Sequence, residues 1–199
     1  MSKARKAIIK RKTKETAIQV KLNIDGKGRS KIKTGIAFLD HMLELFAKHG
    51  LFDLEVKAKG DLAVDLHHTN EDIGICLGEA FNKALGNKKG IRRFGDKTVP
   101  MDEALARVVI DISGRPFLNS DWQVKSTEKV EGYGLEYTRQ FFQALVNNFP
   151  ITVNVSVLAS GPDTHHMLEA IFKAIARAID EATLLDPRIK GVPSTKGRL

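Results

Sequence analysis

The chain has 199 residues, 42% of them apolar and 28% charged, which is the balance of a soluble globular protein with a sizeable core. No apolar run approaches the roughly 18–20 residues that span a bilayer, and the basic start lacks the apolar segment of a secretory signal. The net charge of +8 comes from dispersed basic residues with few aromatics, so we expect neither a membrane nor a nucleic-acid partner. The single cysteine, Cys76, excludes an internal disulfide framework and indicates a cytoplasmic protein.

The first half of the chain predicts strands and helices in alternation. Apolar and polar residues alternate after the basic start, which is typical of a strand, and Asp25-Gly26 predicts that this strand opens a hairpin. Helical spacing of apolar side chains follows and stops at Gly50, a typical helix C-terminus. We expect strands over 17–24 and 52–59 and helices over 34–48 and 67–85.

The second half repeats this order of strands, helix, strand and helix. The sequence His-His-x-x-Glu occurs at 67–71 and again at 165–169, and a shift of 98 positions superposes the two copies and the apolar residues that follow them. Such internal similarity predicts a duplicated half-domain. We expect strands over 107–112, 122–125 and 152–158 and helices over 135–147 and 165–183.

His-His-x-x-Glu at the start of a helix is typical of a metal ligand set. The first histidine and the glutamate lie about 40° from each other around the helix axis, so both can reach one ion. The adjacent histidines diverge by about 100°, so each is expected to serve a different ion. A single pair of histidines is more commonly solvated, but two copies with matching glutamates favour metal ligation. Mixed imidazole and carboxylate ligands suit Mn, Fe, Co or Zn.

Each motif is preceded by a helix that carries one further candidate ligand. His41 stands 26 residues before the first motif, and either Asp40 beside it or a backbone carbonyl is a candidate to orient its imidazole. Gln140 stands 25 residues before the second motif, and an amide oxygen is a weaker ligand than an imidazole. His49 ends the first helix, where we expect a cation favoured by the helix dipole, in contact with substrate rather than metal.

Further segments carry groups that bind anions. Two arginines lie between glycines in 90–95, and the turn 113–116 follows a predicted strand. The segment 193–197 offers hydroxyls, backbone N–H groups and an ammonium. Beside a metal site, such groups indicate a phosphorylated small molecule as the ligand. The candidate residues are Arg93, Arg115, Lys173, Ser194, Thr195 and Lys196.

Taken together, these segments resemble the imidazoleglycerol-phosphate dehydratase family of histidine biosynthesis, in order from about residue 8 to the end. The resemblance implies an α+β fold of two βββαβα half-domains, with helices packed between two four-stranded sheets. It also implies one dehydratase domain over 1–199, with repeat halves at about 8–90 and 97–186 and a tail at 187–199. The matching segments are Arg11-Lys12-Thr13-Lys14-Glu15-Thr16, 34–43, both His-His-x-x-Glu motifs, 99–105, 113–116 and 193–197.

The resemblance implies a reaction and an assembly as well. A hydro-lyase of this family converts imidazole glycerol phosphate to imidazole acetol phosphate and water, with two Mn²⁺ (manganese) ions per active site, and forms trimers that assemble into 24-subunit shells. The proton that leaves is barely acidic, because its carbon has no neighbouring carbonyl. Two cations on the nitrogens of the substrate's imidazole would stabilise it as an imidazolate that can expel hydroxide.

The site residues that the resemblance implies fall into three groups. The expected metal ligands are His41, His67, His68, Glu71, His165, His166 and Glu169, with Gln140 where the family usually has a histidine. The expected catalytic carboxylates are Glu15, Glu71 and Glu169. The expected substrate contacts are Glu15, His41, His49, His67, Glu71 and His165, together with the anion-binding groups named above. Because of Gln140, we expect one of the two manganese sites to bind its ion more weakly.

Two other functions remain open at this point. A nucleic-acid-binding protein with structural metals would need neither Glu15 nor the C-terminal Ser-x-Lys, and it would bind RNA or DNA in a salt-sensitive manner. A dinuclear metallohydrolase is less favoured, because ligand carboxylates are few and no bridging aspartate is evident.

Overall fold

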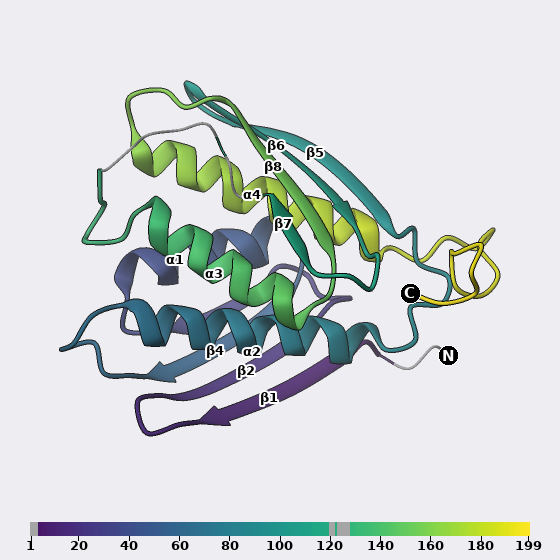
Figure 1. Ribbon diagram of the computed structural model, residues 1–199, viewed down its shortest axis with the longest axis horizontal. Helices are drawn as coiled ribbons and strands as arrows, with labels where there is room; N and C mark the ends of the chain where they lie inside the picture. Colours follow the sequence, from purple (N-terminus) through teal and green to yellow (C-terminus); the bar gives the residue numbers. More distant parts are fainter. Residues whose placement is uncertain (1–3, 120–121, 123–127) are drawn as a thin grey trace.

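Two four-stranded sheets enclose a layer of four helices in the computed structural model, which describes residues 4–119, 122 and 128–199 (Figure 1). Within these residues, none of the helices is both long and apolar enough to cross a bilayer. The first half contributes β1 (Lys6–Lys12), β2 (Ala17–Asn23), β3 (Ser30–Lys33), α1 (Ala37–His49), β4 (Asp53–Lys59) and α2 (His67–Leu85). The second half contributes β5 (Phe94–Met101), β6 (Ala104–Asp111), β7 (Phe117–Asn119), α3 (Leu135–Asn148), β8 (Thr152–Ala159) and α4 (Thr164–Thr183).

The two sheets have the same connectivity. The strand order is β1-β2-β4-β3 in one sheet and β5-β6-β8-β7 in the other. In each sheet the last pair is parallel and the other pairs are antiparallel. The predicted α+β fold, with two βββαβα halves and helices between two four-stranded sheets, is therefore confirmed.

The helices of the two halves exchange partners in the middle layer. Helix α2 lies against β1 and β2, and helix α4 lies against β5 and β6, so each motif helix covers the sheet of its own half. Helix α1 packs against α4 of the other half, and α3 packs against α2. This exchange brings the helix that precedes one motif next to the other motif.

Two glycines allow α3 to approach α2 closely. A Cβ atom at Gly74 would lie 2.6 Å from the carbonyl oxygen of Phe141, and one at Gly78 would lie 2.4 Å from that of Leu145. A side chain at either position would push the two helices apart, because the interior is already close-packed. The close packing leaves Gln140 of α3 lining a groove with the first turns of α2.

The structure corrects one expectation about a turn, and a second expectation, about a strand, falls mostly outside the described residues. The Asp25-Gly26 turn does not open a hairpin, because β2 pairs with β1 and β4, whereas β3 lies at the edge of the sheet, parallel to β4. The expected strand at 122–125 falls mostly outside the described residues, and the strand before this segment is β7 at Phe117–Asn119. Trp122 is buried outside any strand, and residues 123–125 lie outside the described residues.

The first helix begins at Ala37, three residues later than expected, because the segment before it forms a cap. The backbone N–H of Thr34 donates to the Asp40 carboxylate at 2.8 Å, and the Thr34 hydroxyl donates to the same oxygen. No hydrogen bond joins Asp40 to His41 within the described residues. The Asp40 carboxylate holds the start of the helix instead.

Candidate functional site

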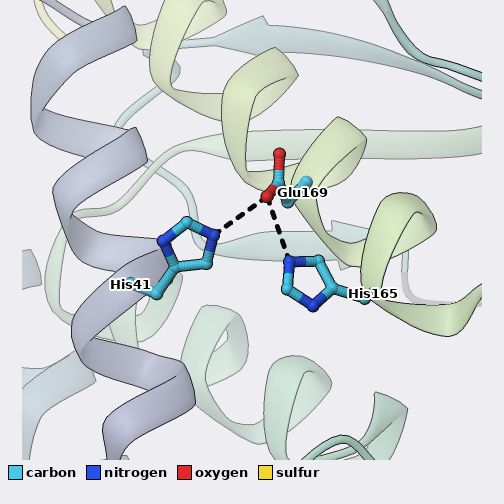
Figure 2. Close-up of side chains that lie close together, drawn as sticks. All are labelled: His41, His165 and Glu169. Atoms are coloured by element: carbon cyan, nitrogen blue, oxygen red, sulfur yellow. Dashed lines mark hydrogen bonds and ion pairs between the residues drawn. The ribbon is translucent and has the colours of Figure 1, made fainter.

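His41, His165 and Glu169 meet between α1 and α4 (Figure 2). The Nε2 atom of His41 lies 2.9 Å from Oε1 of Glu169, and Nε2 of His165 lies 3.1 Å from the same oxygen. Asp163 caps the start of α4 by accepting the backbone N–H of His165 at 2.8 Å. Two imidazoles and a carboxylate, with their ligand atoms within 4.8 Å of one another, are a donor set that fits a divalent transition metal.

Lys173 holds the carboxylate of Glu169 from the next turn of α4. Its ammonium donates to Oε2, so the two oxygens of Glu169 serve different partners. Burial raises the pKa of Glu169, but Lys173, His41 and His165 together outweigh burial and lower this pKa to about 2. Glu169 is therefore ionised at neutral pH although it is buried.

The motif at 67–71 lies against α3 in the corresponding way, and its side chains are more exposed to solvent. His67 Nε2 lies 3.6 Å from Glu71 Oε2, and both residues line a groove with Gln140 and Arg139. The Glu71 side chain is 49% exposed, against 8% for Glu169. The buried Oε1 of Gln140 has no hydrogen-bond partner within the described part of the chain. An unsatisfied oxygen beside an imidazole and a carboxylate fits a third metal ligand, because buried polar atoms are otherwise paired.

The second histidine of each motif points to a different partner from the first. The rings of His67 and His68 stand at 89° to each other, and those of His165 and His166 at 79°. His68 Nδ1 lies 2.8 Å from an Asp61 oxygen, and this hydrogen bond raises the pKa of His68. The two histidines of each motif therefore have separate partners, and a different ion for each stays a prediction.

His166 lies among three carboxylates, none of which belongs to Glu169. Its Nδ1 lies 3.0 Å from Glu103, with Asp102 at 4.0 Å and Asp163 at 3.8 Å from Nε2. The hydrogen bond that His166 makes to the Glu103 carboxylate raises the pKa of His166. The sequence reasoning missed Asp61 and Glu103. A two-residue turn between the strands 94–101 and 104–111 contains Glu103, and recognising this turn in the sequence would have pointed to Glu103.

Glu15 lies in the turn between β1 and β2, close to the first motif. Its Oε2 atom lies 3.9 Å from Nδ1 of His68, and its side chain is 54% exposed. Thr13 accepts the backbone N–H groups of Glu15 and Thr16 through its hydroxyl, at 3.1 and 2.9 Å. The turn therefore presents a carboxylate beside a candidate metal ligand, and contact of Glu15 with the substrate stays a prediction.

Among the arginines expected to bind an anion, one is paired with a carboxylate and another is not. The guanidinium of Arg93 donates twice to Asp111, at 2.7 and 3.0 Å, and once to the carbonyl of Pro193 at 2.9 Å. It thus joins the end of β6 to the tail that carries Ser194, Thr195 and Lys196. No hydrogen bond or ion pair holds the guanidinium of Arg115 within the described residues, which leaves it free for an anion.

His49 ends α1 in a basic environment, as a half-buried side chain. Burial, together with the charges of Lys173 and Arg177, lowers its pKa, so its imidazole is neutral at pH 7. The prediction of a cation at this helix end is therefore wrong. The small cavity around it is lined by Lys48, His49, Leu51, Lys97, Arg177 and Asp180.

Comparison with known proteins relates most of the chain to one family. The family model described as Imidazoleglycerol-phosphate dehydratase matches residues 34–179. Relatives that carry this name occur in Thermoanaerobacter pseudethanolicus, 60% identical over 195 residues, and in Geobacter metallireducens, 57% identical over 196 residues. Each alignment covers 98% of this chain and 100% of the relative.

Solved structures agree with this relationship. The crystal structure of IGPD from Pyrococcus furiosus in complex with (S)-C348 has a TM-score of 0.82 at 38% identity, over 96% of this chain and 100% of that chain. The crystal structure of imidazoleglycerol-phosphate dehydratase from Staphylococcus aureus has a TM-score of 0.78 at 39% identity, over 90% of this chain and 100% of that chain.

Proposed function

The chain belongs to the imidazoleglycerol-phosphate dehydratase family, and we propose that it is a hydro-lyase that dehydrates imidazole glycerol phosphate in histidine biosynthesis. A proton leaves the middle carbon of the glycerol chain, which keeps its hydroxyl. Hydroxide leaves the neighbouring carbon, which is bonded to the imidazole ring. The enol that remains rearranges to the ketone, imidazole acetol phosphate. The hydroxide and the proton together form the water that is released, so the atoms balance.

The observation that carries this proposal is the meeting of His41, His165 and Glu169 between the two halves (Figure 2). We propose that these residues hold one Mn²⁺ ion and that His67, Glu71 and Gln140 hold a second, weaker one. The unpaired oxygen of Gln140 supports the second assignment. Bound divalent cations would supply Lewis-acid stabilisation of negative charge on the substrate's imidazole.

The roles of the carboxylates follow from their surroundings. Glu15 is half-exposed beside His68, where it can accept or return a proton of the substrate's glycerol portion or orient its hydroxyl. Glu169 stays ionised because Lys173, His41 and His165 bond to it, so its carboxylate is suited to bind a metal cation. We assign the corresponding role to Glu71 of the first motif.

The phosphate of the substrate requires cations that are not neutralised within the chain. Arg115 meets this requirement, because nothing in the described residues accepts a hydrogen bond from its guanidinium. Arg93 is paired with Asp111 and holds the tail through the carbonyl of Pro193, which supports a phosphate contact from the neighbouring Ser194, Thr195 and Lys196. The Lys173 ammonium is bonded to Glu169, so we assign Lys173 to holding this carboxylate in place.

We further propose a homo-oligomer, as in the 24-subunit assembly implied by the resemblance. His68 bonds to Asp61 and His166 to Glu103, not to the glutamates of their own motifs, which supports their contribution to sites of neighbouring copies. The buried thiol of Cys76 agrees with a reducing compartment, and we assign the reaction to the cytoplasm.

Turnover of imidazole glycerol phosphate tests this function. The purified protein is stripped with a chelator and assayed with and without added Mn²⁺, and product is expected only with the metal. His41→Ala should lose this response, whereas Glu44→Ala, a change at an exposed position of the same helix, should keep it. Wild-type protein that forms no product in the presence of Mn²⁺ would overturn the proposal.

A further inference from the structure

The turn that carries Glu15 is fastened to α2 through one buried carboxylate. Asp72, the residue after Glu71, accepts a hydrogen bond from Nε of Arg11 at 2.8 Å. Its other oxygen accepts the hydroxyl of Thr16. Arg11 lies in β1 before the turn and Thr16 lies at its end, so the carboxylate holds the turn on both sides.

The attachment extends to Glu15 itself through the backbone. Thr13 and Thr16 bond to each other, with the Thr13 N–H donating to the Thr16 carbonyl at 2.9 Å. The Thr13 hydroxyl accepts the N–H groups of both Glu15 and Thr16. Thr16 is 3% exposed and Asp72 is 7% exposed, so water competes poorly for these hydrogen bonds.

The second half lacks this attachment. A shift of 98 positions places Ala170 at the position of Asp72. The turn there needs no such anchor, because Asp102 and Glu103 form a two-residue turn between the directly paired residues Met101 and Ala104. The turn of the first half has four residues between the paired Lys12 and Ala17, and a longer turn retains more conformational freedom.

We propose that Asp72, together with Arg11 and Thr16, is a positioning group that holds the Glu15 carboxylate at the reacting centre. This inference rests on the proposed function, because it assumes that Glu15 contacts the reacting part of the substrate. Both oxygens of Asp72 are directed to Arg11 and Thr16, so we assign it a role that acts through the turn. A displacement of about 1 Å in a catalytic group can cost on the order of 100-fold in rate, so loosening the turn should lower kcat.

Amide hydrogen exchange and steady-state kinetics on the full-length protein, with Mn²⁺ present, test the proposal. Asp72→Asn and Thr16→Val each remove part of the attachment, and Thr16→Ser keeps the hydroxyl. Asp53→Asn is the matched control, since Asp53 also pairs with an arginine, Arg29, and accepts the N–H of Lys27, but it holds a different loop. Glu15→Gln and wild type are assayed alongside.

Asp72→Asn and Thr16→Val are expected to accelerate exchange of the Glu15 and Thr16 amides and to lower kcat by about 10- to 100-fold, with KM and the number of bound Mn²⁺ ions little changed. Thr16→Ser should restore both readouts, and Asp53→Asn should change neither. Unchanged exchange in Asp72→Asn and Thr16→Val, or faster exchange with an unchanged kcat, would overturn the inference. If wild-type protein forms no product, the proposed function fails, while the exchange data still decide whether Asp72 holds the turn.

Discussion

The Nε2 atom of His41 lies 2.9 Å from Oε1 of Glu169, although the two residues are 128 positions apart in the chain. His41 belongs to the first half and Glu169 to the second, so neither half contains this ligand set alone. The same exchange places Gln140 of the second half beside His67 and Glu71 of the first. The duplication therefore produces two related sites through reciprocal packing of helices.

The substitution Gln140→His should strengthen the weaker of the two metal sites. An imidazole nitrogen is a better ligand for borderline metals than an amide oxygen, and position 140 already lines the groove with His67 and Glu71. Calorimetric titration of metal-free protein with Mn²⁺ should show two unequal affinities in wild type, with the weaker one improved by roughly tenfold or more in the variant.

The control is Gln143→His, one turn further along the same groove. Gln143 bonds to Asn147 and lies farther from the start of α2, so its replacement should leave both affinities unchanged. Two equally tight sites in wild-type protein would contradict the assignment of Gln140 to a weaker site.

The acid stability of the metal-free protein should depend on Glu169. Its pKa falls from an ordinary value of 4.5 to about 2 in the folded chain, so the carboxylate contributes stability that is fully present above pH 4.5. This contribution, at most about 3 kcal/mol, is lost as the pH falls from 4.5 through 2. Urea unfolding of wild type and Glu169→Gln across this range should give a shallower pH dependence for the variant. Parallel curves would contradict the ionised, paired carboxylate.

The substitution Arg115→Gln should weaken substrate binding through the phosphate. Loss of a hydrogen bond to a charged group costs about 1.5–3 kcal/mol, which corresponds to a rise in KM of roughly 10- to 100-fold with kcat largely kept. Arg107→Gln is the control, because Arg107 is exposed on β6 and pairs with Asp96. Equal KM values for the two variants in steady-state assays would argue against a phosphate contact at Arg115.

Cys76 should be unreactive in the folded protein. Its side chain is fully buried in α2, and burial raises the pKa of its thiol to about 12, so almost no thiolate is present at neutral pH. A thiol-specific chromogenic reagent should therefore react only after denaturant is added. Rapid labelling of the native protein would show that α2 opens or that the packing around Cys76 is looser than described.

The strands that the sequence reasoning missed share a physical cause. Strands β1 and β5 are edge strands. Four of the seven residues of β1 and four of the eight of β5 are exposed, and no clear alternation of apolar residues marks either sequence. In β5, Pro100 also breaks the expected pattern, and an edge strand tolerates proline because one side of its backbone needs no partner. The central strands β2, β6 and β8 do alternate, and each was predicted.

The sequence by itself determined the duplicated fold and the residue types of the site. His-His-x-x-Glu at 67–71 and 165–169, with its helical spacing, is a local pattern, and local patterns fix which residues share one face of a helix. Only the tertiary structure decided which residues meet across the two halves. The pairing of His41 with Glu169, the orphaned oxygen of Gln140 and the attachment of Asp72 to Thr16 all depend on how helices and sheets pack. Packing between distant segments is set by the whole core, and no spacing along the chain encodes it directly.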